Sequence, residues 1–140
     1  GKFLDAINAR NTLFQNFSPS NDPWLWKSAG ISGLGYTVVI SGSYAKVEFQ
    51  FSTPEPEMNK FLYDKIYPQK EKIESELGFP LDWQRKEGKR YSKAQYELKG
   101  VDVYNQDDWD KMIQFLITNI EKFVKVFSTR IPEIKKYLKE

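Results

Sequence analysis

Hydrophobic and polar residues follow two different spacings along this chain, and the changes of spacing divide the sequence into elements. In residues 2–15 the apolar side chains recur at the spacing of an amphipathic helix. Residues 24–31, 36–41 and 44–52 are instead strand-length segments separated by glycine-containing turns. The last of these segments alternates apolar with polar residues, so one of its faces suits a core and the other is polar. The pattern predicts a helix followed by a three-stranded meander.

A second helical segment follows residues 54–56 and ends at Gly78, where glycine favours the left-handed conformation that closes a helix. Pro68 lies inside this segment. Because proline lacks a backbone N–H and clashes with the preceding turn, we expect the helix to kink or to divide into two pieces near Tyr67.

The remainder of the chain predicts a hairpin and a long helix. Residues 81–86 and 93–98 alternate in polarity on either side of a basic turn, as in a β-hairpin. Residues 109–127 form one broad apolar stripe at helical spacing, and Asn105 is placed to cap that helix. Pro132 then starts or bends a short basic helix.

The order of these elements is helix, three strands, helix, two strands, helix. Since strands with one charged face leave only their other face to be buried, helices are expected on one side of the sheet. We therefore predict a two-layer α+β fold with an antiparallel five-stranded sheet covered on one face by helices. The chain length suits one such domain over residues 1–140.

The amino-acid composition narrows the classes of function that we expect for this chain. The chain has no histidine and no cysteine, the side chains most used for proton transfer, metal ligation and nucleophilic attack near neutral pH. We therefore expect a binding or accessory domain with no catalytic residues, no metal and no cofactor. A lysine-rich chain without cysteine fits a reducing cytoplasm, which is the localisation we expect. Its apolar runs are too short for a membrane-spanning helix, so we expect no membrane contact.

Several short motifs in a fixed order are similar to those of a known family. They are the IESELG run at 73–78, the LDWQR run at 81–85, the Asp108-Trp109 pair, the Trp24 strand, the Gly33 turn and the Val47-Glu48 strand. On these residues the chain resembles the family called domain of unknown function 4268 (DUF4268), over essentially its whole length.

The resemblance implies a bacterial or archaeal protein and a domain at the C-terminal end of a longer chain. In such proteins the other domains often look like nucleases or restriction systems. It therefore implies an accessory role around nucleic acid, with a fused or neighbouring nuclease-like domain as a partner. It implies no catalytic residue, and it leads us to expect arginine where this chain has Lys93.

The predicted hairpin is the first candidate site, because it mixes cations with aromatic rings. Phosphate attraction and base stacking together require that combination. The basic C-terminal tail, residues 122–140, is a second source of positive charge. Alternatively, Trp83 and Tyr91 are core residues and the charges are simply solvated. The candidate nucleic-acid-binding residues are Arg85, Lys86, Lys89, Arg90, Tyr91 and Lys93.

Trp24 and Trp26 form a second candidate, because side chains two residues apart on a strand lie on the same face. They predict either an exposed stacking platform or a contact for protein interaction or self-association. The alternative is that both tryptophans pack beneath the first or the last predicted helix, because tryptophan is mostly buried in proteins.

The third candidate is a metal-dependent nuclease built on carboxylates. Glu48 on a strand and Asp82 elsewhere faintly resemble the acidic pair that holds a divalent metal in restriction-type nucleases. Such sites need a nearby lysine, but Gln50 occupies its place. The leading hypothesis is accordingly a non-catalytic domain that contacts nucleic acid, with protein interaction and metal-dependent cleavage as alternatives.

Overall fold

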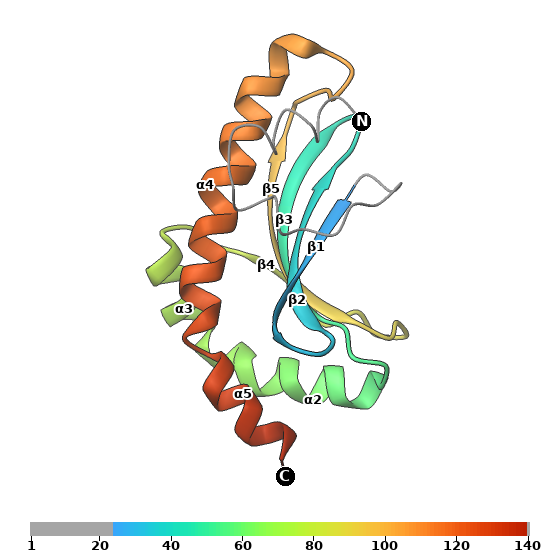
Figure 1. Ribbon diagram of the computed structural model, residues 1–140, viewed down its shortest axis with the longest axis vertical. Helices are drawn as coiled ribbons and strands as arrows, with labels where there is room; N and C mark the ends of the chain where they lie inside the picture. Colours follow the sequence, from blue (N-terminus) through green and yellow to red (C-terminus); the bar gives the residue numbers. More distant parts are fainter. Residues whose placement is uncertain (1–23, 140) are drawn as a thin grey trace.

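The computed structural model describes residues 24–139, and its centre is a five-stranded antiparallel sheet (Figure 1). The spatial order of the strands is β1-β2-β3-β5-β4. The predicted helix over residues 2–15 lies outside the described residues. The strands are β1 (Trp24–Ile31), β2 (Leu34–Ile40), β3 (Tyr44–Phe51), β4 (Asp82–Gln84) and β5 (Ser92–Lys99). The predicted antiparallel α+β fold is therefore confirmed.

Within residues 24–139, four α-helices follow or interrupt the strands. They are α2 (Pro56–Ile66), α3 (Lys70–Leu77), α4 (Trp109–Ser128) and α5 (Ile131–Leu138), with short 3-10 helices η2 (Tyr67–Gln69) and η3 (Gln106–Asp108). Figure 1 shows α4 along one side of the sheet and α2 crossing beyond its lower end. Within residues 24–139, every helix is too short or too polar to cross a bilayer.

The second helical segment divides at proline, as predicted. Helix α2 ends at Ile66, the 3-10 turn η2 contains Pro68, and α3 starts at Lys70. Gly78 closes α3 in the left-handed conformation, with φ 93°. Because η2 redirects the chain, α2 contacts β3 and β5 whereas α3 packs against α4.

Helix α4 supplies the largest apolar surface that covers the sheet. The Asn105 side chain accepts a hydrogen bond from the backbone N–H of Asp107 at 3.1 Å, which caps η3 just before α4. At the other end, the rings of Phe127 and Phe49 stack with centroids 4.4 Å apart. Stacking between a helix and the central strand fixes α4 on the face of the sheet that carries Phe49.

The opposite face of the sheet is polar, and the strand register aligns its side chains in rows. One row runs straight across all five strands. Its members, from β1 to β4 through β2, β3 and β5, are Trp26, Thr37, Glu48, Gln95 and Asp82. The predicted polarity of this face is right, yet Glu48 at its centre is only 2% exposed. A buried carboxylate on an otherwise polar face requires partners, and these define the candidate site.

Candidate functional site

A cavity of about 460 Å³ lies on the polar face of the sheet. The described residues that line it come from strands or from the segments that adjoin them. They are Trp26, Thr37, Val39, Lys46, Glu48, Gln50, Ser52, Arg90, Tyr91 and Lys93. Cavities that bind small ligands have volumes of roughly 300–1,000 Å³, so this one is large enough for a ligand of modest size.

Glu48 is the hub of the cavity, because four donors meet on its carboxylate. Its Oε1 atom accepts from the Thr37 hydroxyl at 2.8 Å and from Gln50 Nε2 at 2.7 Å. Its Oε2 atom lies 2.6 Å from Lys93 Nζ and 3.2 Å from Lys46 Nζ. Burial would raise the pKa of Glu48, but the bonds and charges from Lys93, Gln50 and Lys46 outweigh burial and lower it. Glu48 is therefore ionised near neutral pH.

The same contacts bear on the metal-site hypothesis. A carboxylate offers about four lone-pair positions, and four donors already occupy those of Glu48. Asp82 lies two strands away in the register, and it accepts from Gln95 Nε2 at 3.2 Å and from Gln84 Nε2 at 2.6 Å. Among residues 24–139 there is no cluster of three or more groups suited to a metal ion. The two carboxylates do not converge as a shared metal site requires.

The two ammonium groups on Glu48 differ in their surroundings. Lys46 also donates to Gln95 Oε1 at 3.3 Å, and its Nζ lies 5.2 Å from the Tyr44 ring centroid. Burial would lower the pKa of Lys46, but the Glu48 carboxylate outweighs burial and raises it. Lys93 is more deeply buried, and burial lowers its pKa despite Glu48. Three charged groups thus share the floor of the cavity, two positive and one negative.

An indole ring forms one wall of the cavity. Trp26 lies against Gly35 of the neighbouring strand, where an added Cβ atom would come within 2.5 Å of the ring. Glycine at this position therefore makes the space that the indole fills. Trp26 lies on the face of the sheet opposite α4, so it does not pack beneath that helix. The first predicted helix, the other candidate cover for Trp26, lies outside the described residues. The side chain of Trp24 lies outside the described part of the structure.

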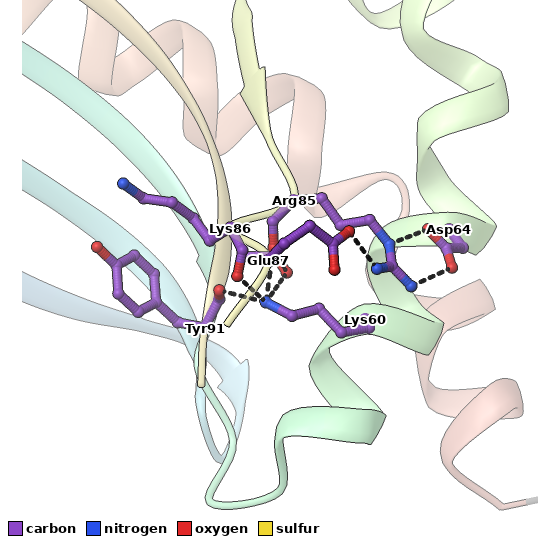
Figure 2. A network of polar contacts seen from close by, with 7 residues as sticks. Lys60, Asp64, Arg85, Lys86, Glu87 and Tyr91 are labelled. Carbon is purple, nitrogen blue, oxygen red and sulfur yellow. Dashed lines mark hydrogen bonds and ion pairs between the residues drawn. The ribbon is translucent and has the colours of Figure 1, made fainter. Parts of the chain in front are cut away.

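The loop of residues 85–91, between β4 and β5, borders the cavity and is anchored to α2 by one lysine (Figure 2). Lys60 Nζ donates to the carbonyl oxygens of Arg85, Lys86 and Tyr91 at 2.6, 3.0 and 2.7 Å. It also lies 3.0 Å from the Ser92 hydroxyl. A single ammonium group thus joins both ends of the loop.

The side chains of this loop divide between two directions. Figure 2 shows Arg85 facing α2, where its Nε and Nη2 atoms donate to the Asp64 carboxylate at 2.9 and 3.0 Å. Arg85 also pairs with Glu87. Lys86 and Tyr91 point the other way, and Lys86 Nζ lies 5.9 Å from the Tyr91 ring centroid. Lys86 has φ 63°, a conformation that costs a non-glycine residue roughly 1–2 kcal/mol.

Arg90 is held at the mouth of the cavity by backbone carbonyl groups. Its Nη1 atom donates to Ser52 O at 2.9 Å and to Thr53 O at 2.7 Å. Asn59 Nδ2 donates to the Arg90 carbonyl oxygen at 2.8 Å. Guanidinium has five N–H donors, and within residues 24–139 only Nη1 of Arg90 has acceptors, so Nε and Nη2 can donate to a ligand.

The structure brings some of the predicted site residues together and separates others. Arg90, Tyr91, Lys93 and Trp26 all line the cavity, although they were proposed as two separate sites. Lys86 and Lys89 lie on the bordering loop, and Arg85 faces away from the cavity. Sequence reasoning missed the participation of Lys46, Thr37 and Lys60. The alternation in β3 was the one signal for Lys46, since it places that residue on the same face as Glu48.

The basic tail does not contribute to this cavity. Arg130 is 4% exposed and pairs with Glu76 through two bonds of 2.8 Å, so its charge serves packing between α3 and the start of α5. The large exposed apolar side chains of residues 24–139 do not line the cavity either. Phe61 lies on α2, Tyr67 on η2 and Tyr104 before η3.

Comparison with known families supports the resemblance found in the sequence. The model of the family described as domain of unknown function (DUF4268) matches residues 1–131. Comparison with curated proteins and with solved structures found no match.

Proposed function

The chain belongs to the DUF4268 family, and we propose that it is a non-catalytic accessory domain that binds single-stranded nucleic acid. The proposed contact surface is the polar face of the sheet together with loop 85–91. One observation carries the proposal: the cavity lining that residues 24–139 supply combines two aromatic rings with three cationic side chains and one carboxylate, which is already neutralised. Proteins that bind single strands use this combination of a cationic groove and stacking rings.

The residues divide into two roles in this proposal. Lys86, Lys89 and Arg90 attract the phosphate backbone from the loop and the cavity mouth. Trp26 and Tyr91 offer ring faces on which bases stack. Base stacking contributes roughly 1–3 kcal/mol per base, and it needs no particular base.

Single strands fit this surface better than duplexes do. Trp26 and Tyr91 line a recess, and a base reaches a recessed ring only when its own face is exposed. In a duplex the base faces are stacked on each other, so only phosphate contacts would remain. We therefore expect a preference for single-stranded oligonucleotides over duplexes of the same length.

Binding measured over a range of salt concentrations tests the proposal. Fluorescence anisotropy of a labelled oligonucleotide should show an affinity that falls steeply as salt rises, because counterions are released on binding. Lys86→Ala combined with Lys89→Ala removes two phosphate contacts and should reduce the slope of log affinity against log salt by about 1.4.

The matched control is Lys111→Ala combined with Lys125→Ala, which removes the same charge from exposed positions of α4. This control should leave both the affinity and the salt slope close to those of the unchanged protein. Absence of binding at low salt, or equal effects of the two double variants, would refute the proposal.

A further inference from the structure

We infer that the floor of the cavity is a specific site for the phosphate group of one nucleotide, held by the ammonium groups of Lys93 and Lys46. The base of that nucleotide would lie against Trp26 and Tyr91. This inference rests on the proposed function and names the ligand unit that the cavity accepts. It treats the cavity as a pocket for a single nucleotide, whereas the loop lysines contact the rest of the strand.

The first support is the incomplete hydrogen bonding of Lys93. Its side chain is 8% exposed, and an ammonium group carries three N–H donors. Within residues 24–139 its Nζ atom has one hydrogen-bond acceptor, Glu48 Oε2. Buried donors without acceptors cost free energy, so a ligand that brings acceptor oxygens to Lys93 gains that energy on binding.

The second support is the charge on the floor. Lys93 and Lys46 share one carboxylate, so the buried cluster carries an excess positive charge. The other acidic groups on this face have partners of their own. Glu97, opposite Lys46 in the register, lies 3.7 Å from Lys99 Nζ, and Asp82 accepts from two glutamine amides. An anion is therefore the ligand that the floor favours.

The third support is the combination of this floor with the walls. Arg90 stands at the mouth with free donors, and rings from Trp26 and Tyr91 face the same space. A phosphate group alone would use the floor and leave the rings without a partner. A nucleoside alone would use the rings and leave Lys93 without an acceptor. A nucleotide uses both.

The experiment is isothermal titration calorimetry of the whole chain with adenosine monophosphate, adenosine, inorganic phosphate and a short unphosphorylated single strand. Adenosine monophosphate should bind at least about tenfold more tightly than adenosine, as expected when a charged hydrogen bond is added. A strand with a terminal phosphate distinguishes a chain end from an internal phosphodiester as the source of the anion.

Two variants test the floor while keeping the protein folded. Lys93→Met combined with Glu48→Gln removes both members of the most deeply buried ion pair, and Lys46, whose side chain is 14% exposed, keeps its bond to Gln95 Oε1. Lys46→Met keeps Lys93 on Glu48 and removes only the second ammonium group. Each variant should weaken adenosine monophosphate at least about tenfold and adenosine little. Thermal melting confirms folding, and Lys111→Ala serves as the control.

The outcomes separate the inference from the proposed function. Equal affinities for adenosine monophosphate and adenosine would overturn the phosphate site, and so would floor variants that bind adenosine monophosphate as tightly as the unchanged protein. If the single strand still bound, the proposed function would stand. Nucleotide binding without strand binding would uphold the pocket and overturn the proposed function. A chain that binds none of the four probes would overturn both.

Discussion

At the residue level, the cavity depends on a buried carboxylate that holds two ammonium groups side by side. Glu48 is positioned for this by the alternation of β3, and Lys93 reaches it diagonally from β5. Pairs of this kind do not by themselves stabilise a fold, because desolvation offsets much of their attraction. Removing one partner is nevertheless costly, since the other charge then remains buried.

Glu48→Gln should lower the free energy of unfolding by about 3 kcal/mol at neutral pH, because the buried ammonium group of Lys93 and the partly buried one of Lys46 lose their counterion. Since the pKa of Glu48 is below its usual 4.5, its contribution is present above that pH and is lost as the pH falls through the lowered pKa. Urea unfolding at several pH values measures both effects.

The variant should accordingly lose less stability in acid than the unchanged protein. Glu97→Gln is the matched control on the same face, where a looser ion pair contributes less than about 1 kcal/mol. Parallel pH profiles for the Glu48 variant and the unchanged protein would contradict this account of Glu48.

Gly35→Ala should displace the Trp26 indole, because the added Cβ atom would come within 2.5 Å of the ring and 2.6 Å of the Lys27 carbonyl oxygen. We expect a shift of the Trp26 indole N–H signal in NMR spectra. We also expect about a tenfold loss of oligonucleotide affinity, because one base stacked on an aromatic ring contributes roughly 1–3 kcal/mol.

Gly42→Ala is the control for that substitution, since its Cβ atom would meet only a Tyr104 carbon at an ordinary 3.6 Å. It should leave the indole signal and the affinity unchanged. If the two alanine variants behave alike, Trp26 is not the stacking wall that we describe.

At the level of elements, helix α2 determines where loop 85–91 lies. Lys60 and Asn59 of α2 bind carbonyl groups of the loop, and Asp64 one turn later binds Arg85 (Figure 2). These bonds hold Lys86 in its left-handed conformation, with its side chain above Tyr91. A strained residue persists only where its surroundings fix it, and here the fixing group is on another element.

Lys60→Met should therefore release the loop while leaving the sheet intact. We expect backbone amides of residues 85–91 to exchange with solvent at least tenfold faster, as local opening becomes easier, and strand binding to weaken. Hydrogen exchange read by NMR measures the first effect and anisotropy the second.

Lys65→Met, five residues later on the same helix, is the control. Lys65 Nζ does not face the loop; it lies 5.4 Å from the Phe61 ring centroid and 5.3 Å from the Tyr137 ring centroid. It should leave loop exchange unchanged. Unaltered exchange in the Lys60 variant would show that the loop is held by other contacts.

The sequence predicted the elements well because their signals are local. Alternation located the strands, Pro68 divided the second helix and Gly78 closed it. The pairing of β5 with β3 has no such local signal, because it depends on tertiary packing of the hairpin against a strand distant in the sequence. That pairing brings Lys93 beside Glu48, so the centre of the cavity could not be predicted from either segment alone.

At the scale of the whole molecule, the two faces of the sheet differ in what covers them. One face of the sheet is covered by α4 and forms the core, whereas the other carries the cavity. The sequence predicted that one face would be polar and that the hairpin would be basic. It could not show that Arg85 pairs with α2 or that Arg130 is buried, since both depend on partners distant in sequence.

The most direct test of nucleic-acid binding on the polar face is an NMR titration of the isotope-labelled whole chain with a short single strand. We predict that the shifted signals map to the cavity strands β1, β2, β3 and β5, to loop 85–91 and to the Trp26 indole. Signals that shift only on α4 and α5, or no shifts at saturating strand, would contradict the central claim.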